Sequence, residues 1–264
     1  MKQKEILLFG ASGQIGRNLI RKLSQNNYKI TAVTRNTHRA GYILKTQANP
    51  GYLELVEVKN FSSQKIEDLM KNTTICINLI GILFEKEKDQ FKTIHTDLPD
   101  LLSQKAKKFQ IEKFVQISSL GIEKATESNY AKSKLEGEKK IKENFKNSII
   151  LKPSIVYSVD DNFTTRFMTL LSRLPMMPLY YNGNTKFSPI HVSDLTDIIL
   201  KTINGKTNAL TLECIGPEII TFKEIIKKLL TSIQKKRLLI PIPYQLASLS
   251  AKILQIFPNP LLTE

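Results

Sequence analysis

The chain has 264 residues, of which 41% are hydrophobic and 24% are charged, and its formal net charge is +15. This composition is typical of an ordinary globular protein, so it excludes disordered and fibrous classes, and the length suffices for one large core with or without a smaller lobe. The lysines are spread along the chain without a nucleic-acid-binding motif, so we expect no nucleic-acid partner, and a solvated lysine-rich surface accounts for the charge.

Short apolar runs and helical segments alternate through the first part of the chain. A buried strand is predicted over 5–9, and Ile15, Leu19 and Leu23 then recur at helical spacing. Further strands are predicted over 29–34, 53–58, 74–80, 113–118 and 148–156, and further helices near 64–71, 91–108 and 129–145. This alternation predicts an α/β fold in which residues 1–157 form a Rossmann-type, doubly wound parallel sheet.

Residues 158–264 have a looser pattern, because prolines from Pro175 to Pro243 break them into short segments. They are predicted to form a smaller, mixed α/β lobe for a substrate or a partner, interleaved with the sheet. Residues 186–192 are expected to return to the sheet as an extended segment, and Ser193 is a candidate cap for the helix that follows.

Other segments argue against further classes of protein. Cys76 and Cys214 lie in apolar runs without zinc-site spacing, so we predict reduced core cysteines and no metal centre. His95 and His191 are expected to pack or to form hydrogen bonds. The start of the chain leaves no room for a signal peptide, which indicates a cytoplasmic protein. Prolines interrupt the apolar tail over 238–257 before it reaches membrane-spanning length, so we expect a core or surface-lying helix there.

A glycine-rich turn joins the first strand to the first helix, which is the context in which this pattern binds a dinucleotide. Gly10 permits a tight turn, Gly13 lets the backbone approach a pyrophosphate, and Gly16 allows the helix to pack on the strand. The amides at the start of the helix would then face the phosphates. A glycine turn without a ligand is the alternative.

The residues after the second strand bear on the choice of nucleotide. NAD-specific enzymes commonly place there an acid that hydrogen-bonds the ribose 2′-hydroxyl, but this chain continues Thr34-Arg35-Asn36. Arg35, together with Arg39, could pair with a 2′-phosphate through its guanidinium group. We therefore predict NADP(H) in preference to NAD(H), with a plain surface charge at Arg35 as the alternative.

Tyr130 and Lys134 are separated by one helical turn and therefore share one face of the predicted helix. The ammonium group is expected to lower the pKa of the tyrosine and to make it a better proton donor or acceptor toward a carbonyl or an alcohol. Ser118 and Ser119 end the preceding strand, where a parallel sheet presents its ligand-facing edge, so one of these hydroxyls could orient a substrate oxygen.

Taken together, these segments resemble an extended or atypical short-chain dehydrogenase/reductase of the NAD-dependent epimerase/dehydratase type. The resemblance covers nearly the whole chain and rests on the glycine turn, residues 78–81 (Asn-Leu-Ile-Gly), Ser118-Ser119, Tyr130 with Lys134, and residues 152–154 (Lys-Pro-Ser). Residues 78–85 and 186–192 are similar to one subgroup, which contains the nucleotide-binding alpha-subcomplex subunit 9 of respiratory complex I and its bacterial relatives.

The resemblance implies a bound NADP(H), with Tyr130 as the acid/base and Lys134 as its partner. The implied nucleotide contacts are Gly10, Ser12, Gly13, Gln14, Ile15, Gly16 and Arg35, with Gly81 and Lys134 nearer the ribose and nicotinamide. Residues 58–61 (Val-Lys-Asn-Phe) depart from the family, many members of which place an aspartate against the adenine there. Relatives also continue beyond Glu264, so the C-terminal lobe is expected to be incomplete.

Three functions stay open on this basis. The first is an accessory or assembly subunit of respiratory complex I that holds NADP(H) as a structural ligand, in the cytoplasm or at the surface of the inner membrane. The second is an active NADP(H)-dependent reductase, epimerase or dehydratase on a small-molecule substrate, in which Tyr130 moves the proton while the cofactor carries the hydride. The third is a sensor of the NADP+/NADPH ratio that binds a partner without catalysis.

Overall fold

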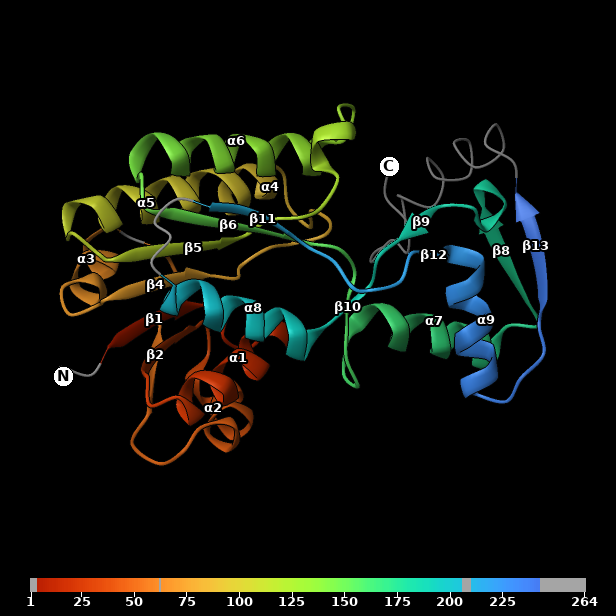
Figure 1. The fold of residues 1–264 in the computed structure, drawn as a ribbon, viewed down its shortest axis with the longest axis horizontal. Coiled ribbons are helices and arrows are strands. Elements are labelled where there is room, and N and C mark those ends of the chain that lie inside the picture. The colour runs from red at the N-terminus through yellow and green to blue at the C-terminus, as the bar shows by residue number, and fades with distance from the viewer. Residues whose placement is uncertain (1–3, 62, 206–209, 243–264) are drawn as a thin grey trace. The chain divides into compact units, whose positions relative to one another are not determined.

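The structure is a computed structural model that describes residues 4–61, 63–205 and 210–242. The chain divides into two compact units (Figure 1). The first unit comprises residues 1–153 and 192–214, and the second comprises residues 154–191 and 215–264. The chain therefore passes between the units three times, at 153, 191 and 214. Residues 192–214, which the sequence analysis assigned to the C-terminal lobe, belong to the first unit.

A seven-stranded sheet forms the centre of the first unit, and all its neighbouring strands are parallel. In spatial order the strands are β11 (Leu210–Cys214), β6 (Ser148–Pro153), β5 (Lys113–Ile117), β4 (Ile75–Asn78), β1 (Glu5–Phe9), β2 (Lys29–Thr34) and β3 (Leu53–Glu57). The order reverses between β4 and β1, and open α/β sheets bind ligands at such a switch point. The predicted Rossmann-type sheet is confirmed.

Helices cover both faces of this sheet (Figure 1). One face carries α3 (Ser63–Met70), α5 (Leu98–Lys108) and α6 (Asn129–Asn144), and the other carries α1 (Gln14–Gln25), α2 (Thr37–Leu44) and α8 (Val192–Asn204). Short helical turns complete the unit: η1 (Lys45–Gln47), α4 (Gln90–Lys92), the π-helical turn η2 (Thr93–Asp97) and η3 (Ile122–Lys124). Because both faces are covered, the central strands read as continuous apolar runs.

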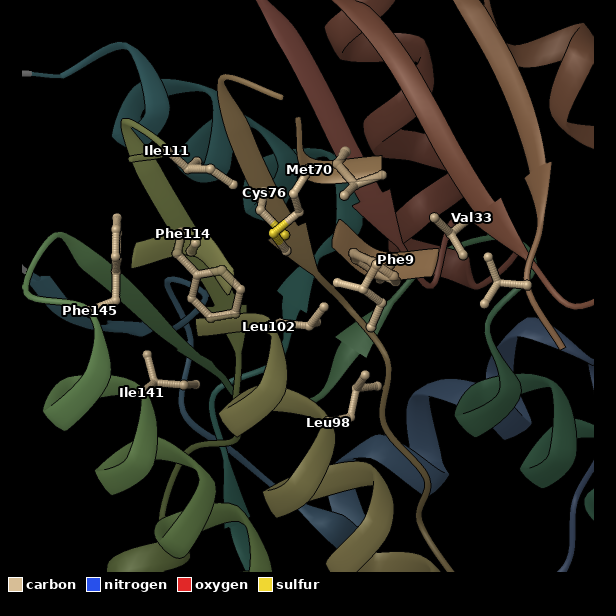
Figure 2. Close-up of a cluster of buried hydrophobic side chains, with 14 residues drawn as sticks. Phe9, Val33, Met70, Cys76, Leu98, Leu102, Ile111, Phe114, Ile141 and Phe145 are labelled. Atoms are coloured by element: carbon tan, nitrogen blue, oxygen red, sulfur yellow. The ribbon is translucent and has the colours of Figure 1, made fainter. Parts of the chain in front are cut away.

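One hydrophobic core lies between the sheet and helices α3, α5 and α6 (Figure 2). Phe9 on β1 and Phe114 on β5 are fully buried in it. Cys76 lies in the same cluster, and Cys214 is buried on β11. Both cysteines are free and buried, as predicted for core residues, and burial raises the pKa of both thiols, that of Cys214 to about 11.

The structure corrects three expectations about the later segments. The strand predicted over 148–156 ends at Pro153, and the chain continues as a separate strand, β7 (Val156–Tyr157). Residues 186–192 do not join the main sheet, because their strand β10 (Ile190–His191) pairs with β7 and the sheet is completed by β11. Helix α8 begins at Val192, so Ser193 lies inside its first turn instead of capping it.

Within its described residues, the second unit contains helices and short strands around a core of their own. Its elements, besides β7 and β10, are α7 (Asn162–Arg173), β8 (Met176–Tyr180), η4 (Tyr181–Gly183), β9 (Lys186–Phe187), β12 (Ile220–Thr221), α9 (Phe222–Ser232) and β13 (Leu238–Ile242). Phe167 and Leu171 of α7 pack with Ile226 and Leu230 of α9 in this core. The prediction of a helix over 238–257 is wrong at its start, because residues 238–242 form strand β13. The rest of that prediction lies outside the described residues.

Among the described helices, none combines the length and the apolar character that crossing a membrane requires.

Candidate functional site

The glycine turn follows β1 and leads into α1. Gly10 has a φ of +78°, and a Cβ at this position would lie 2.9 Å from the backbone carbon of Leu79. A Cβ at Gly16 would lie 2.5 Å from the carbonyl oxygens of Gly10 and Ala11. These positions therefore need glycine for the tight turn and for the close approach of helix to turn, as the sequence analysis expected.

The N-terminus of α1 faces the carboxyl edge of the sheet without a neutralising charge of its own. Gly13 is the N-cap in extended conformation and offers no side chain to the first turn. Ser12 and Gly13 are exposed, and Gln14, Ile15 and Gly16, which open the helix, carry no negative charge. The positive end of the helix dipole is therefore available to an anion such as a phosphate.

Arg35 and Arg39 are exposed beyond the end of β2, where Asn36 caps α2 by accepting a hydrogen bond from the Arg39 amide at 2.8 Å. The structure also brings to this edge a carboxylate that sequence reasoning missed. Glu57 ends β3 next to β2, and one of its oxygens accepts hydrogen bonds from the amide and the hydroxyl of Thr37 at 3.0 and 3.1 Å. Lys59 lies 3.3 Å from its other oxygen.

The pKa of Glu57 lies below its usual value, mainly because of the hydrogen bond from the Thr37 amide. This carboxylate therefore stays ionised and paired at the start of α2.

Tyr130, Lys134, Ser119 and Gly81 come together at the carboxyl ends of β4 and β5. Tyr130 lies in the first turn of α6, and its phenolic oxygen is 2.7 Å from the hydroxyl oxygen of Ser119. The Lys134 ammonium nitrogen lies 5.4 Å from the centre of the Tyr130 ring. A Cβ at Gly81 would lie 3.8 Å from that same nitrogen. The sequence predicted this set of neighbours except for the choice of serine.

Ser118, the other candidate serine, belongs to a buried ionic cluster. Its hydroxyl donates to Glu138 at 2.5 Å, and the second Glu138 oxygen lies 2.9 Å from the ammonium of Lys152, which also pairs with Glu123. Glu138 follows Lys134 by one helical turn, as Lys134 follows Tyr130. This repeated spacing is the sequence signal that could have revealed Glu138.

Burial sets the protonation of the pair. It raises the pKa of Tyr130, and the hydrogen bond with Ser119 offsets this only in part. It also lowers the pKa of Lys134 to about 8, against the opposing charge of Glu138. The predicted lowering of the tyrosine pKa is therefore wrong, because the Lys134 nitrogen lies over the ring and burial disfavours the phenolate.

His95 packs behind Tyr130 in an aromatic cluster. Its ring stacks on Phe91 at 5.4 Å and meets the Tyr130 ring edge-on at 5.3 Å. Nε2 accepts a hydrogen bond from the Ile82 amide at 3.1 Å, and Nδ1 lies 3.0 Å from the hydroxyl of Ser133.

The tautomer of His95 follows from these contacts. The Ser133 hydroxyl donates to the Tyr130 carbonyl, so Nδ1 carries the proton and donates to Ser133. Burial, followed by the nearby charge of Lys134, lowers the pKa of His95 to about 3. The expected hydrogen-bonding role is confirmed, and this neutral ring links the loop after β4 to α6.

Two curated relatives match most of the chain. It is 22% identical over 249 residues to the mitochondrial NADH-ubiquinone oxidoreductase 40 kDa subunit of Neurospora crassa, covering 94% of this chain and 65% of that protein. It is 26% identical over 237 residues to the mitochondrial NADH dehydrogenase (ubiquinone) 1 alpha subcomplex subunit 9 of Dictyostelium discoideum, covering 89% of this chain and 66% of that protein. The chain thus spans just under two thirds of either relative.

Two solved structures share the fold. UDP-glucuronic acid 4-epimerase from Bacillus cereus, in complex with UDP-glucuronic acid and NAD, has a TM-score of 0.76 at 17% identity, covering 97% of this chain and 94% of that one. The dTDP-4-dehydrorhamnose reductase from Bacillus anthracis, in complex with NADP, has a TM-score of 0.71 at 18% identity, covering 92% and 85%. The family model described as "NAD dependent epimerase/dehydratase family" matches residues 6–211. The chain therefore belongs to the NAD-dependent epimerase/dehydratase family.

Proposed function

We propose that the protein binds NADP(H) in its first unit and serves as an accessory or assembly subunit of respiratory complex I. The observation that carries the nucleotide site is the turn between β1 and α1, which presents exposed backbone and a helix N-terminus at the switch point of the sheet. The proposed contacts are Gly10, Ser12, Gly13, Gln14, Ile15, Gly16 and Arg35, with Gly81 and Lys134 toward the ribose and nicotinamide.

The charges at the end of β2 favour a 2′-phosphate over a 2′-hydroxyl. Arg35 and Arg39 are exposed there, and Lys59 adds a third cation. Glu57 is the nearby acid, but Thr37 and Lys59 already occupy its oxygens, so it is a poor acceptor for a ribose hydroxyl. We therefore infer a preference for NADP(H) over NAD(H).

The complex I role rests on the two relatives, whose names describe subunits of NADH dehydrogenases. The net charge of +15 is compatible with a peripheral position on the anionic cytoplasmic surface of an inner membrane. The second unit would then serve mainly as a contact surface for partner subunits.

A second candidate function is catalysis, which the Ser119–Tyr130 contact of 2.7 Å favours. Ser119 would hold a substrate oxygen, and the Tyr130 hydroxyl would give a proton to it or take one from it. Lys134, whose ammonium lies 5.4 Å from the centre of the Tyr130 ring, would be the partner of Tyr130 in this step. Bound NADP(H) would supply hydride chemistry. Ser118 has no part in this step, because Glu138 engages its hydroxyl.

Nucleotide extracted from the purified protein tests the first proposal. We expect NADP(H), and we expect the protein to be recovered with respiratory membrane subunits. Recovery of NAD(H) alone would overturn the nucleotide preference, and a monomeric pool without those subunits would overturn the accessory role. Tyr130→Phe separates the second candidate, because it should abolish turnover of any carbonyl substrate found while leaving nucleotide affinity and subunit recovery unchanged.

A further inference from the structure

The second unit contains a cavity that the proposed nucleotide site does not use. It has a volume of about 380 Å³, and every residue that lines it belongs to this unit. Its apolar walls include Ile155, Phe163, Pro189, Pro217, Ile225 and Leu229. The volume lies within the range of sites for small molecules.

The cavity walls are held in place by contacts within the unit. The Gly216 amide donates to the Ser188 carbonyl at 3.1 Å. A Cβ at Gly216 would lie 1.8 Å from the Pro189 carbonyl oxygen, so the loops that carry Pro189 and Pro217 are in direct contact. On the helical side, a capping box between Thr221 and Glu224 fixes the start of α9. The cavity is therefore preformed.

Three of the four polar side chains that line the cavity, all but Tyr157, are already paired within the unit. The Thr164 hydroxyl lies 2.5 Å from an oxygen of Asp161, whose carboxylate caps α7. The Lys228 ammonium donates to Glu218 at 3.0 Å. A sugar or a diphosphate would have to break these contacts in order to be recognised, whereas an aliphatic chain needs only the apolar walls.

The second unit is basic, and one of its lysines, Lys228, lines the cavity. The described residues of the second unit contain nine lysines and arginines against four acids, and Lys223, Lys227 and Lys228 are exposed on α9. Ile219, next to the lining residue Glu218, is 72% exposed. We propose that this cavity binds the aliphatic chain of an anionic amphiphile, such as a fatty acid, whose carboxylate takes the place of Glu218 against Lys228, the lysine of α9 that lines the cavity. The proposal is independent of the nucleotide site.

Dodecanoate is the probe for this proposal, titrated below its micellar concentration into the full-length protein by calorimetry. We expect one saturable site, about tenfold weaker binding of dodecyltrimethylammonium, which has the same chain and the opposite charge, and no binding of UDP. Absence of dodecanoate binding, or binding of UDP in its place, would overturn the proposal. Equal binding of the two amphiphiles would overturn its anionic part.

Variants locate the site. Leu229→Trp fills the cavity and should abolish dodecanoate binding, whereas Ile219→Trp, at an exposed position outside it, should retain the wild-type affinity. Circular dichroism checks each fold, and Ile220→Trp on β12 replaces Leu229→Trp if that variant unfolds. A folded cavity variant that still binds with wild-type affinity would overturn the location. NADP(H) titration of the same variants keeps this outcome separate from any failure of the nucleotide site.

Discussion

The two units distribute polar and apolar side chains in opposite ways. Among the described residues, the first unit contains fourteen of the fifteen buried polar or charged side chains, and the second contains only Asp161. The second unit in turn contains nine of the twelve exposed large hydrophobic side chains, including Val159 and Ile219. Buried polar groups must be paired in fixed geometry, so the first unit is suited to position reacting atoms. Exposed apolar groups suit the second unit to bind apolar ligands or partners.

The largest expected effect comes from removing the centre of the buried ionic cluster of the first unit. Glu138→Ala leaves the hydroxyl of Ser118 without its acceptor and the buried ammonium of Lys152 with only the half-exposed Glu123. Breaking a buried pair in this way costs about 3–5 kcal/mol, which urea unfolding would measure. Glu123→Ala is the control, because the Glu123 side chain is 50% exposed and its loss should cost less than about 1 kcal/mol. Equal losses of unfolding free energy in the two variants would contradict the assignment of Glu138 as the buried centre of the cluster.

The next effect is a pH dependence that arises at Lys134. Its pKa is lowered to about 8 in the folded protein, so the unfolded chain holds this proton more tightly. Burial of the Lys134 ammonium should therefore lower the free energy of unfolding by its full amount below pH 8. The free energy of unfolding should then rise between about pH 8 and 10.5, by roughly 2–4 kcal/mol.

Lys134→Met removes the titrating group, so it should stabilise the protein at neutral pH and reduce the rise. Unfolding of the wild type and of this variant across pH measures the difference. This difference isolates Lys134 from Lys113, whose pKa burial also lowers. Parallel curves for the two proteins would exclude Lys134 as the source.

The smallest effect concerns nucleotide choice. Arg35→Ala should weaken NADP(H) binding by about 1.5–3 kcal/mol, the value of hydrogen bonds to charged groups, and should leave NAD(H) binding unchanged. Arg173→Ala removes an exposed cation at the end of α7, in the second unit, and should change the affinity for neither nucleotide. Fluorescence titration of both nucleotides measures this. Equal weakening of both by Arg35→Ala would mean that Arg35 does not read the 2′ position.

The fold was predictable where apolar runs are long and uninterrupted. Strands β1 and β2 were predicted with the bounds that the structure gives, since their residues are buried by helices on both sides. Helix α2 was missed, because it is short and contains Gly41. Strand β11 was missed because it is a half-buried edge strand whose pairing with β6 depends on distant residues.

The candidate site was predictable only where its residues are close in sequence. The spacing of Tyr130 and Lys134 placed them on one helix face. Ser118 and Ser119 point to opposite sides of an extended chain. The sequence does not show which side faces the site, so the two serines could not be told apart. His95 and Glu57 reach the site through tertiary packing, which the sequence does not reveal. The pKa of Tyr130 was misjudged for the same reason, since burial follows from the folded core.

The two crossings that enclose residues 192–214 have a consequence for dissecting this protein. A fragment ending at Pro153 would lose β11 and so leave the buried strand β6 as a bare sheet edge, which invites aggregation. It would also lose the carbonyls of Thr202 and Gly205 that receive the Lys113 ammonium. A separable nucleotide-binding fragment must therefore be made by splicing 192–214 back onto the end of β6 through a short linker; simple truncation would not yield one.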